Sequence, residues 1–94
     1  MIIRIVKMTF HLENTEAFEL LFDAVKEKIS KFEGCQKVTL LKDIKNPSTF
    51  FTYSIWDSET ALDLYRKSAF FDDTWTKTKA LFSAKAVAWS LEEH

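Results

Sequence analysis

The fold is decided by residues 49–71, which read TFFTYSIWDSETALDLYRKSAFF. The first eight of them are rich in aromatic and β-branched residues, which predicts a strand over Thr49–Trp56 with aromatic side chains on both faces. Asp57 or Ser58 then offers a helix N-cap, and apolar residues follow at helical spacing. An acidic pair after Ser68 looks like a fresh helix start, so a break or kink is expected there.

Upstream of this segment the sequence predicts a strand and a long helix. Ile2–His11 alternates with period two, as a strand does, although neither of its two residue sets is polar throughout. The helix would begin at an N-cap, Asn14 or Thr15, and end at Gly34, the only glycine, which fits a left-handed C-cap. Its apolar residues recur at the spacing of an amphipathic helix. They are Phe18, Leu21, Phe22, Val25, Ile29 and Phe32.

Two further strands complete a β-α-β-β-α-β order. One is predicted over Cys35–Ile44, and Lys45–Ser48 has the composition of a turn that joins it to Thr49–Trp56 as a hairpin. A short last strand is expected over about Lys85–Leu91. This order predicts an α+β, ferredoxin-like fold: a four-stranded antiparallel sheet with both helices on one face, formed by residues 1–94 as a single domain.

Composition excludes several classes of function. The chain has 13 Lys and Arg against 14 Asp and Glu, with no basic segment, so no nucleic-acid partner is expected. The longest apolar run is far shorter than the roughly 20 residues of a membrane span, and no signal peptide is visible, which favours the cytoplasm and no membrane partner. One glycine cannot build a phosphate-binding loop, and two His with one Cys give no metal-ligand spacing. Neither a metal nor a cofactor is expected.

The sheet is expected to pair with a second copy of itself. The chain has 9 Phe, 3 Trp and 2 Tyr, and the first and third strands place large apolar side chains on both faces. Two helices cover one face only, and leaving the other in water would expose an apolar patch larger than monomers usually carry. Burying on the order of 1,000 Å² of apolar surface supplies roughly 25 kcal/mol before association costs. We therefore predict a homodimer through the sheet faces, related by a two-fold axis.

The segment Phe51–Phe71 also resembles a known family. A strand that ends in Trp56, an acidic helix cap, an Ala-Leu pair and the Ser-x-x-Phe motif of Ser68–Phe71 are together similar to the antibiotic biosynthesis monooxygenase (ABM) family. Glu33-Gly34-Cys35 resembles the motif between that family's first helix and second strand, and Asp43-Ile-Lys-Asn-Pro47 resembles its hairpin turn. The resemblance covers nearly the whole chain. It implies a dimeric α+β barrel, in which two protomers close their sheets around a shared interior.

The activity that the resemblance implies depends on the positions that depart from the family pattern. Known members include cofactor-independent monooxygenases of polycyclic aromatics or quinols, and haem-degrading enzymes. The haem-degrading members use an Asn in the first strand, which this chain lacks, and a Trp and a His that are Tyr65 and Trp75 here. The aromatic-oxidising members use an Asn four residues before the strand-end Trp. Trp56 is retained, but Thr52 stands in the Asn position, so the carry-over of catalytic residues stops at Trp56. Haem degradation is not expected, because the chain has neither the His nor the first-strand Asn of the haem-degrading members.

Six residues are candidates for a functional site. Tyr65 could donate a hydrogen bond to a quinol-like oxygen, and His11, the only internal histidine, could act as a general base near neutral pH. The residues expected to line a substrate pocket, where a flat ring would stack, are Trp56, Trp75, Phe71 and Thr52. The plainer alternative is a core or interface position for the aromatic residues and a surface position for His11. Cys35 is interpreted as a small buried residue and Arg66 as a solvated helix position.

Two functions remain open at this point. The first is a cofactor-independent monooxygenase of a small aromatic or quinol substrate, held in an aromatic-lined pocket where O₂ reacts with the activated substrate itself. The second is a non-catalytic dimeric module that binds a hydrophobic ligand or has a structural role. The family resemblance favours the first, whereas the departures at Thr52, Tyr65 and Trp75 favour the second. Both pocket hypotheses require a cavity able to hold a ring system.

Overall fold

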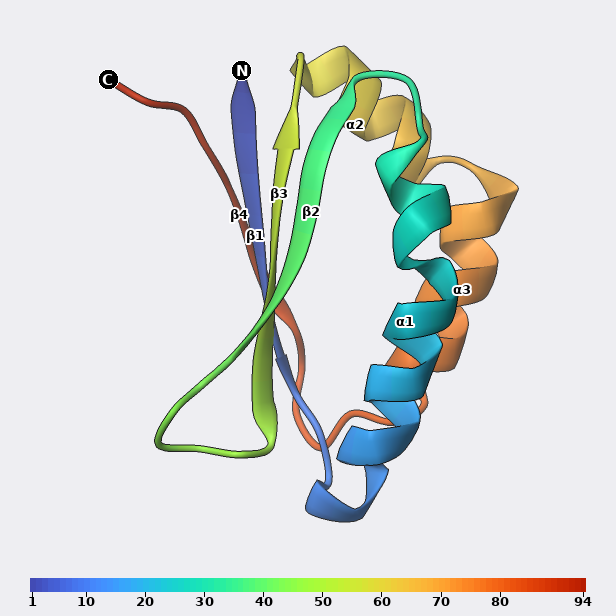
Figure 1. Ribbon diagram of the computed structural model, residues 1–94, viewed down its shortest axis with the longest axis vertical. Helices are drawn as coiled ribbons and strands as arrows, with labels where there is room; N and C mark the ends of the chain where they lie inside the picture. Colours follow the sequence, from blue (N-terminus) through green and yellow to red (C-terminus); the bar gives the residue numbers. More distant parts are fainter.

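The computed structural model describes residues 1–94 as two layers, an antiparallel sheet with helices packed on one of its faces (Figure 1). The strand order across the sheet is β2-β3-β1-β4. The elements in chain order are β1 (Ile2–Thr9), a 3-10 turn (Leu12–Asn14), α1 (Thr15–Ser30), β2 (Cys35–Lys42), β3 (Thr49–Trp56), α2 (Glu59–Arg66), α3 (Ala69–Lys79) and β4 (Val87–Leu91). This order confirms the predicted α+β, ferredoxin-like fold class. No helix has the length and apolar character that a membrane span requires.

The second helical region is broken in two where the sequence predicted a break. Ser58 caps α2, because its side chain accepts a hydrogen bond from the Ala61 N–H at 3.1 Å. Ser68 caps α3 in the same way, with the Phe71 N–H as donor at 3.1 Å, and its hydroxyl donates to the Tyr65 carbonyl at 2.6 Å. Each serine satisfies a backbone group that a helix end leaves without a partner. The two short helices therefore meet at a fixed corner.

The prediction that Gly34 closes the first helix is wrong. α1 ends at Ser30, and its C-cap, Lys31, has an ordinary right-handed conformation. Gly34 does adopt a positive φ of 85°, but in the following turn, where its carbonyl accepts a hydrogen bond from the Asp57 N–H at 2.8 Å. A Cβ at this position would collide with the Cβ of Ala61, so the glycine allows α2 to approach the turn.

Three predicted boundaries differ from the structure, and Asn14, a predicted N-cap, holds that position without the capping hydrogen bond. β1 ends at Thr9, whose carbonyl accepts from the Ser83 N–H at 2.9 Å as the chain leaves the sheet. β2 ends at Lys42, because Asp43 begins a turn in which its carboxylate accepts two backbone N–H groups. β4 begins at Val87 rather than Lys85. Asn14 precedes α1 without a side-chain cap, and its amide donates instead to the Leu81 carbonyl at 3.3 Å.

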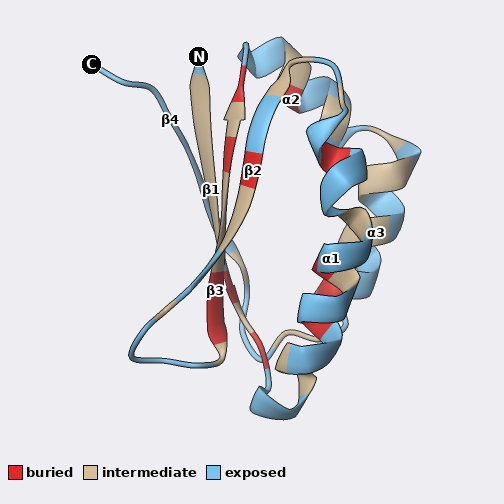
Figure 2. Cartoon of the chain, in the orientation of Figure 1, coloured by how far each residue is buried: buried red, intermediate tan, exposed pale blue.

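The core lies between the layers and is strongly aromatic (Figure 2). Alternate residues of β1 and β3 face the helices and pair across the two strands, Met8 with Phe50 and Ile2 with Trp56. Trp56 is only 1% exposed, and its indole N–H donates to the Ser54 hydroxyl at 3.0 Å. The buried apolar residues are Met8, Phe10, Phe18, Phe22, Ile29, Val38, Phe50, Trp56 and Leu62.

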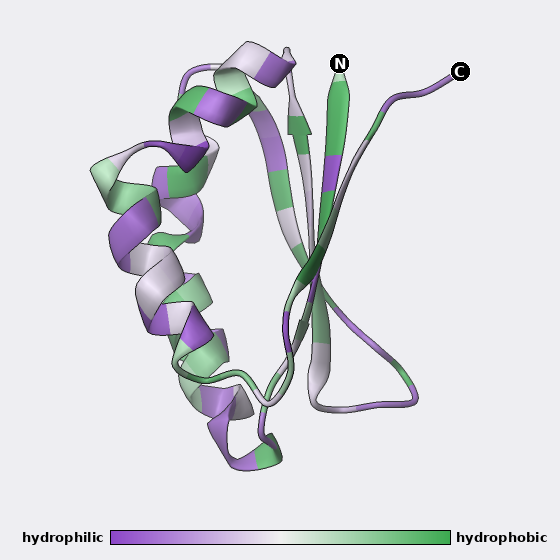
Figure 3. Cartoon of the chain, turned by 180° about the vertical axis from the view of Figure 1, so that it is seen from behind, coloured by the Kyte–Doolittle hydropathy of each residue, from purple (hydrophilic) through white to green (hydrophobic).

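The opposite face of the sheet, here called the outer face, is covered by no element of the chain (Figure 1). Strand pairing sets its side chains in rows, one of which runs from Tyr53 through Ile5 to Trp89. Trp89 keeps 42% of its surface exposed. Hydrophobic and hydrophilic segments alternate along the strands (Figure 3). The apolar members of the outer face are Ile3, Ile5, Leu41, Phe51, Tyr53, Ile55, Val87, Trp89 and Leu91. The predicted two-sided apolar sheet is therefore present in one chain.

Candidate functional site

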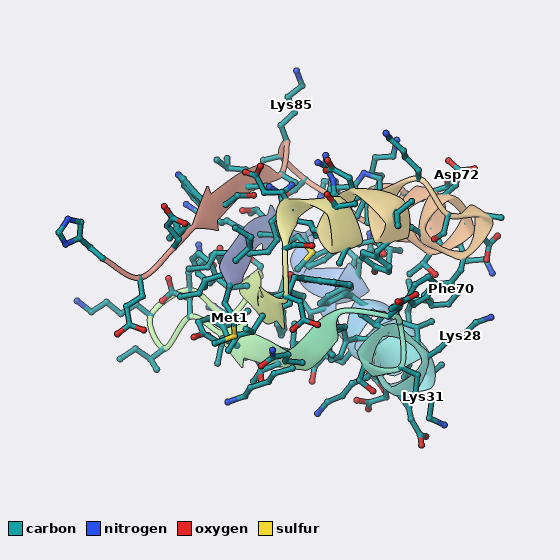
Figure 4. All side chains as sticks on the ribbon, turned by 90° about the horizontal axis from the view of Figure 1, so that it is seen from above. Met1, Lys28, Lys31, Phe70, Asp72 and Lys85 are labelled. Atoms are coloured by element: carbon teal, nitrogen blue, oxygen red, sulfur yellow. The ribbon has the colours of Figure 1, made fainter.

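A cavity of about 260 Å³ lies between the sheet and the helices. Fifteen of the 21 residues that line it are hydrophobic, and they come from β1, β2, β3, β4 and all three α-helices. Figure 4, a view from above, shows α1 and α3 side by side and nearly end-on, with α2 running from α3 toward the sheet. Arg66 and Ala88 are the only lining residues that are exposed, which places the opening between α2 and β4.

Aromatic rings form one continuous wall of the cavity. Tyr65 of α2 stacks on Trp56 of β3, with ring centroids 4.9 Å apart and planes inclined by 25°. The edge of Tyr65 also meets Phe71, 5.1 Å away, and Phe71 stacks on Trp75 of α3 at 5.8 Å. Offset stacking and edge contacts are the preferred arrangements of aromatic pairs, so these rings hold one another in place. The corner at Ser68 turns the chain so that the α2 and α3 rings meet.

The structure brings together five of the six residues singled out from the sequence. Tyr65, Trp56, Trp75, Phe71 and Thr52 all line the cavity. The buried position of Trp56 agrees with its plainer alternative as a core residue, and the same ring also forms part of the cavity wall. The hydroxyl of Thr52 makes no hydrogen bond within the chain, unlike that of its neighbour Ser54.

His11 lies elsewhere. It is exposed, precedes the 3-10 turn beyond the end of β1, and is not among the residues that line the cavity. The reason is that β1 ends two residues before it, so the chain has already left the sheet. Nowhere do three or more His, Cys, Asp or Glu side chains converge as metal ligands would.

The ionisable residues of the cavity wall are Arg4, Tyr65 and Arg66. Burial, followed by the charge of Cys35, raises the pKa of Tyr65, so its hydroxyl stays protonated and acts as a hydrogen-bond donor. Burial lowers the pKa of Arg4, and the neighbouring Arg66 guanidinium adds to this effect while Asp63 opposes it. An arginine remains charged in proteins even so. The wall therefore presents donors and positive charge.

Arg4 is a charged lining residue that the sequence reasoning missed. It sits in the residue set of β1 that faces the helices, between Ile2 and Val6, and its guanidinium donates to the Ser90 hydroxyl on β4 at 2.9 Å. A charged residue within an otherwise apolar set was the available signal. The thiol of Cys35, in contrast, is half-buried outside the cavity, and burial raises its pKa.

Comparison with known proteins finds a matching family and solved structures with the same fold over nearly the whole chain. The profile of the antibiotic biosynthesis monooxygenase family matches residues 1–77. A conserved protein from Methanosarcina mazei Go1 is 21% identical, with a TM-score of 0.92 over 99% of this chain and 93% of its own. A structure described as an antibiotic biosynthesis monooxygenase is 19% identical, with a TM-score of 0.93 over 100% and 99% of the two chains. A protein from Mycobacterium tuberculosis is 17% identical, with a TM-score of 0.90 over 99% and 94%. Comparison with curated proteins finds no significant match.

Proposed function

Because the chain belongs to the antibiotic biosynthesis monooxygenase family, we propose that it oxidises a small electron-rich aromatic or quinol substrate in the cavity between sheet and helices. The observation that carries this proposal is the aromatic wall of Trp56, Tyr65, Phe71 and Trp75 around an apolar space. Such a wall fits the flat face of a conjugated ring and excludes water from it. The reaction would need no cofactor, as in the aromatic-oxidising members of the family.

The size of the cavity favours a substrate of one or two rings. A cavity of about 150 Å³ is enough to bind benzene, whereas sites for drug-sized ligands begin at about 300 Å³. The cavity volume of about 260 Å³ falls between these values. A polycyclic substrate would require the helices to move away from the sheet.

The proposed reaction is balanced without a further reductant. A quinol and O₂ give a hydroxyquinone and water: one oxygen atom forms a new bond to a ring carbon, and the other leaves as water. The ring loses four electrons, which O₂ gains, and both protons of the water come from the substrate. Tyr65 would donate a hydrogen bond to the substrate oxygen as negative charge develops there, and the apolar walls would keep water from the reacting carbon.

Turnover in ¹⁸O₂ tests this proposal. We expect the hydroxyquinone to contain one ¹⁸O atom and the quinol to disappear faster with the protein than in buffer. Tyr65→Phe should lower this turnover about a hundredfold, because the donor to the developing negative charge is lost. Tyr53→Phe, which removes a phenol hydroxyl from the outer face instead, is the matched control. A panel of one- and two-ring quinols that is oxidised no faster with the protein than without it would contradict the proposal.

A second function is favoured by one observation, the chemistry of the lining groups. Arg4, Tyr65 and Arg66 all carry protons at neutral pH, so each can donate to a ligand but is poorly suited to remove a proton from it. A module that only binds an aromatic ligand needs donors of this kind and no base. Tight binding of a quinol under anaerobic conditions, combined with no uptake of O₂ in air, would favour this function.

The proposed unit of function is a homodimer in which the outer faces of two chains pack together. Two features support it: the apolar rows of the outer face and the exposed surface that Leu41, Val87 and Leu91 retain, 46–47% each. Packing sheet on sheet would bury these rows in a layer about 10 Å thick. In this arrangement each cavity stays within its own protomer, between sheet and helices.

A further inference from the structure

We infer that the cavity binds its ligand as an anion, with an aromatic body among the rings and one anionic oxygen group, a carboxylate or a phenolate, against Arg4 and Arg66. This inference rests on the proposed use of the cavity as a ligand site, but not on the oxidation. It concerns the positively charged part of the cavity wall, Arg4 and Arg66, for which the stacking of an aromatic ligand gives no reason.

The distribution of basic residues first points to this part of the wall. The chain has only two arginines, and both line the cavity, one from β1 and one from the end of α2. All of its other basic residues are lysines, and none of them lines the cavity. Arginine differs from lysine in its planar fork of five N–H donors, which matches the two oxygens of a carboxylate.

Neither arginine forms an ion pair within the chain. The two ion pairs of the chain join Lys31 to Glu27 and Lys77 to Asp73, both on helix surfaces. The hydrogen bond that Arg4 makes is to the neutral hydroxyl of Ser90, which leaves most of its donors free. Asp63 lies near enough to attract Arg4 but forms no ion pair with it.

The charge of Arg66 disfavours the charge of Arg4, which forms no ion pair within the chain. Arg4 is half-buried on the sheet, and both burial and the charge of Arg66 lower its pKa. A ligand oxygen with a negative charge offsets both the burial of Arg4 and the repulsion from Arg66, because it supplies a counter-charge and accepts hydrogen bonds from the unused N–H groups. Partial burial strengthens the attraction, since solvent and salt screen a half-buried pair less than an exposed one.

The position of the arginines fixes the orientation of the ligand. Arg66 is exposed at the opening, whereas the other lining residues apart from Arg4 are hydrophobic or carry only a neutral hydroxyl. An amphipathic ligand would therefore enter with its ring first and keep its anionic group near the opening. If the ligand is a quinol, the same two charges stabilise its phenolate, which gives up an electron to O₂ more readily than the neutral phenol does.

Calorimetric titration with 2-naphthoate and the neutral alcohol 2-naphthalenemethanol tests the inference, because the two probes share a ring system and neither is oxidised. The native protein should bind naphthoate at least tenfold more tightly at low salt, a difference of about 1.4 kcal/mol. Arg4→Gln and Arg66→Gln should each remove most of this preference, and Arg4→Lys should keep part of it. Lys67→Gln, which changes the same charge beside the site, should keep all of it.

Equal affinity for the two probes would overturn the inference, as would a preference that survives in both glutamine variants. Thermal unfolding checks that Arg4→Gln folds. If Arg4→Gln does not fold, Arg66→Gln still tests the inference, because the side chain of Arg66 is exposed. The outcome is separable from that of the proposed oxidation. Selective naphthoate binding without any quinol turnover would leave the anion site standing alone, whereas turnover without selectivity would leave the oxidation standing alone.

Discussion

Gly34 adopts a φ of 85° at a point where α2 comes close to the turn. Gly34→Ala should lower the free energy of unfolding by about 3 kcal/mol, because the left-handed backbone and the contact with Ala61 are both unfavourable for a side chain. Urea denaturation measures this change. Adding Ala61→Gly should recover the part due to the contact and leave the part due to φ. A loss below about 0.5 kcal/mol would show that the turn rearranges freely.

Tyr65 gives the chain a dependence of stability on high pH. Its ordinary pKa is 10.0, and burial, the larger cause, raises it in the folded state. Above pH 10 the unfolded chain loses this proton while the folded chain keeps it, so the contribution is complete below pH 10 and is lost as the pH rises. Above pH 10 the free energy of unfolding should therefore fall more steeply with pH in the native chain than in Tyr65→Phe, by up to about 1.4 kcal/mol per pH unit. Parallel curves would contradict this.

At the scale of elements, the corner between α2 and α3 positions the aromatic wall. Ser68→Ala removes the hydrogen bonds to the Phe71 N–H and the Tyr65 carbonyl, and should lower the free energy of unfolding by about 1 kcal/mol. It should also weaken naphthoate binding, because both of these residues carry rings of the wall. Ser58→Ala removes a comparable cap at the start of α2 and is the control. It should lower stability by a similar amount and leave binding unchanged; equal effects of both variants on binding would exclude a special role for the corner.

Elements of this kind follow from the sequence because their causes are local. The caps at Ser58 and Ser68 and the turn after Asp43 each depend on residues within three positions of one another. The exact end of β1 does not follow, since it depends on a partner, Ser83, that comes from another part of the chain. Gly34 illustrates the same limit: its positive φ was predictable, but the close approach of Ala61, which leaves no room for a side chain at this position, was not.

At the scale of the whole molecule, the cavity could be predicted only in part. Its aromatic wall comes from Trp56–Trp75, a stretch short enough for strand and helix periodicity to align the rings. Its charged wall joins Arg4 to Arg66 across more than half of the chain, and only the assembled sheet and helix bring them together. The candidate role of His11 in the cavity could not be decided from the sequence for a related reason, because a residue at the end of a strand can lie either over the core or beyond it; its exposed position agrees with the plainer alternative of a surface residue.

The outer face yields the last prediction, which concerns assembly. Trp89→Lys places a charge in the central row of that face, next to Ile5, where a partner sheet would bury it without a counter-charge. Sedimentation velocity should show twice the chain mass of 11.0 kDa for the native protein and the single mass for this variant. Leu20→Lys and Leu64→Lys, at positions 64% and 67% exposed on the helices, should leave the dimer intact. A native protein that sediments as a folded 11.0 kDa particle at micromolar concentration would mean that this apolar face remains in water, and would remove the basis for a shared barrel.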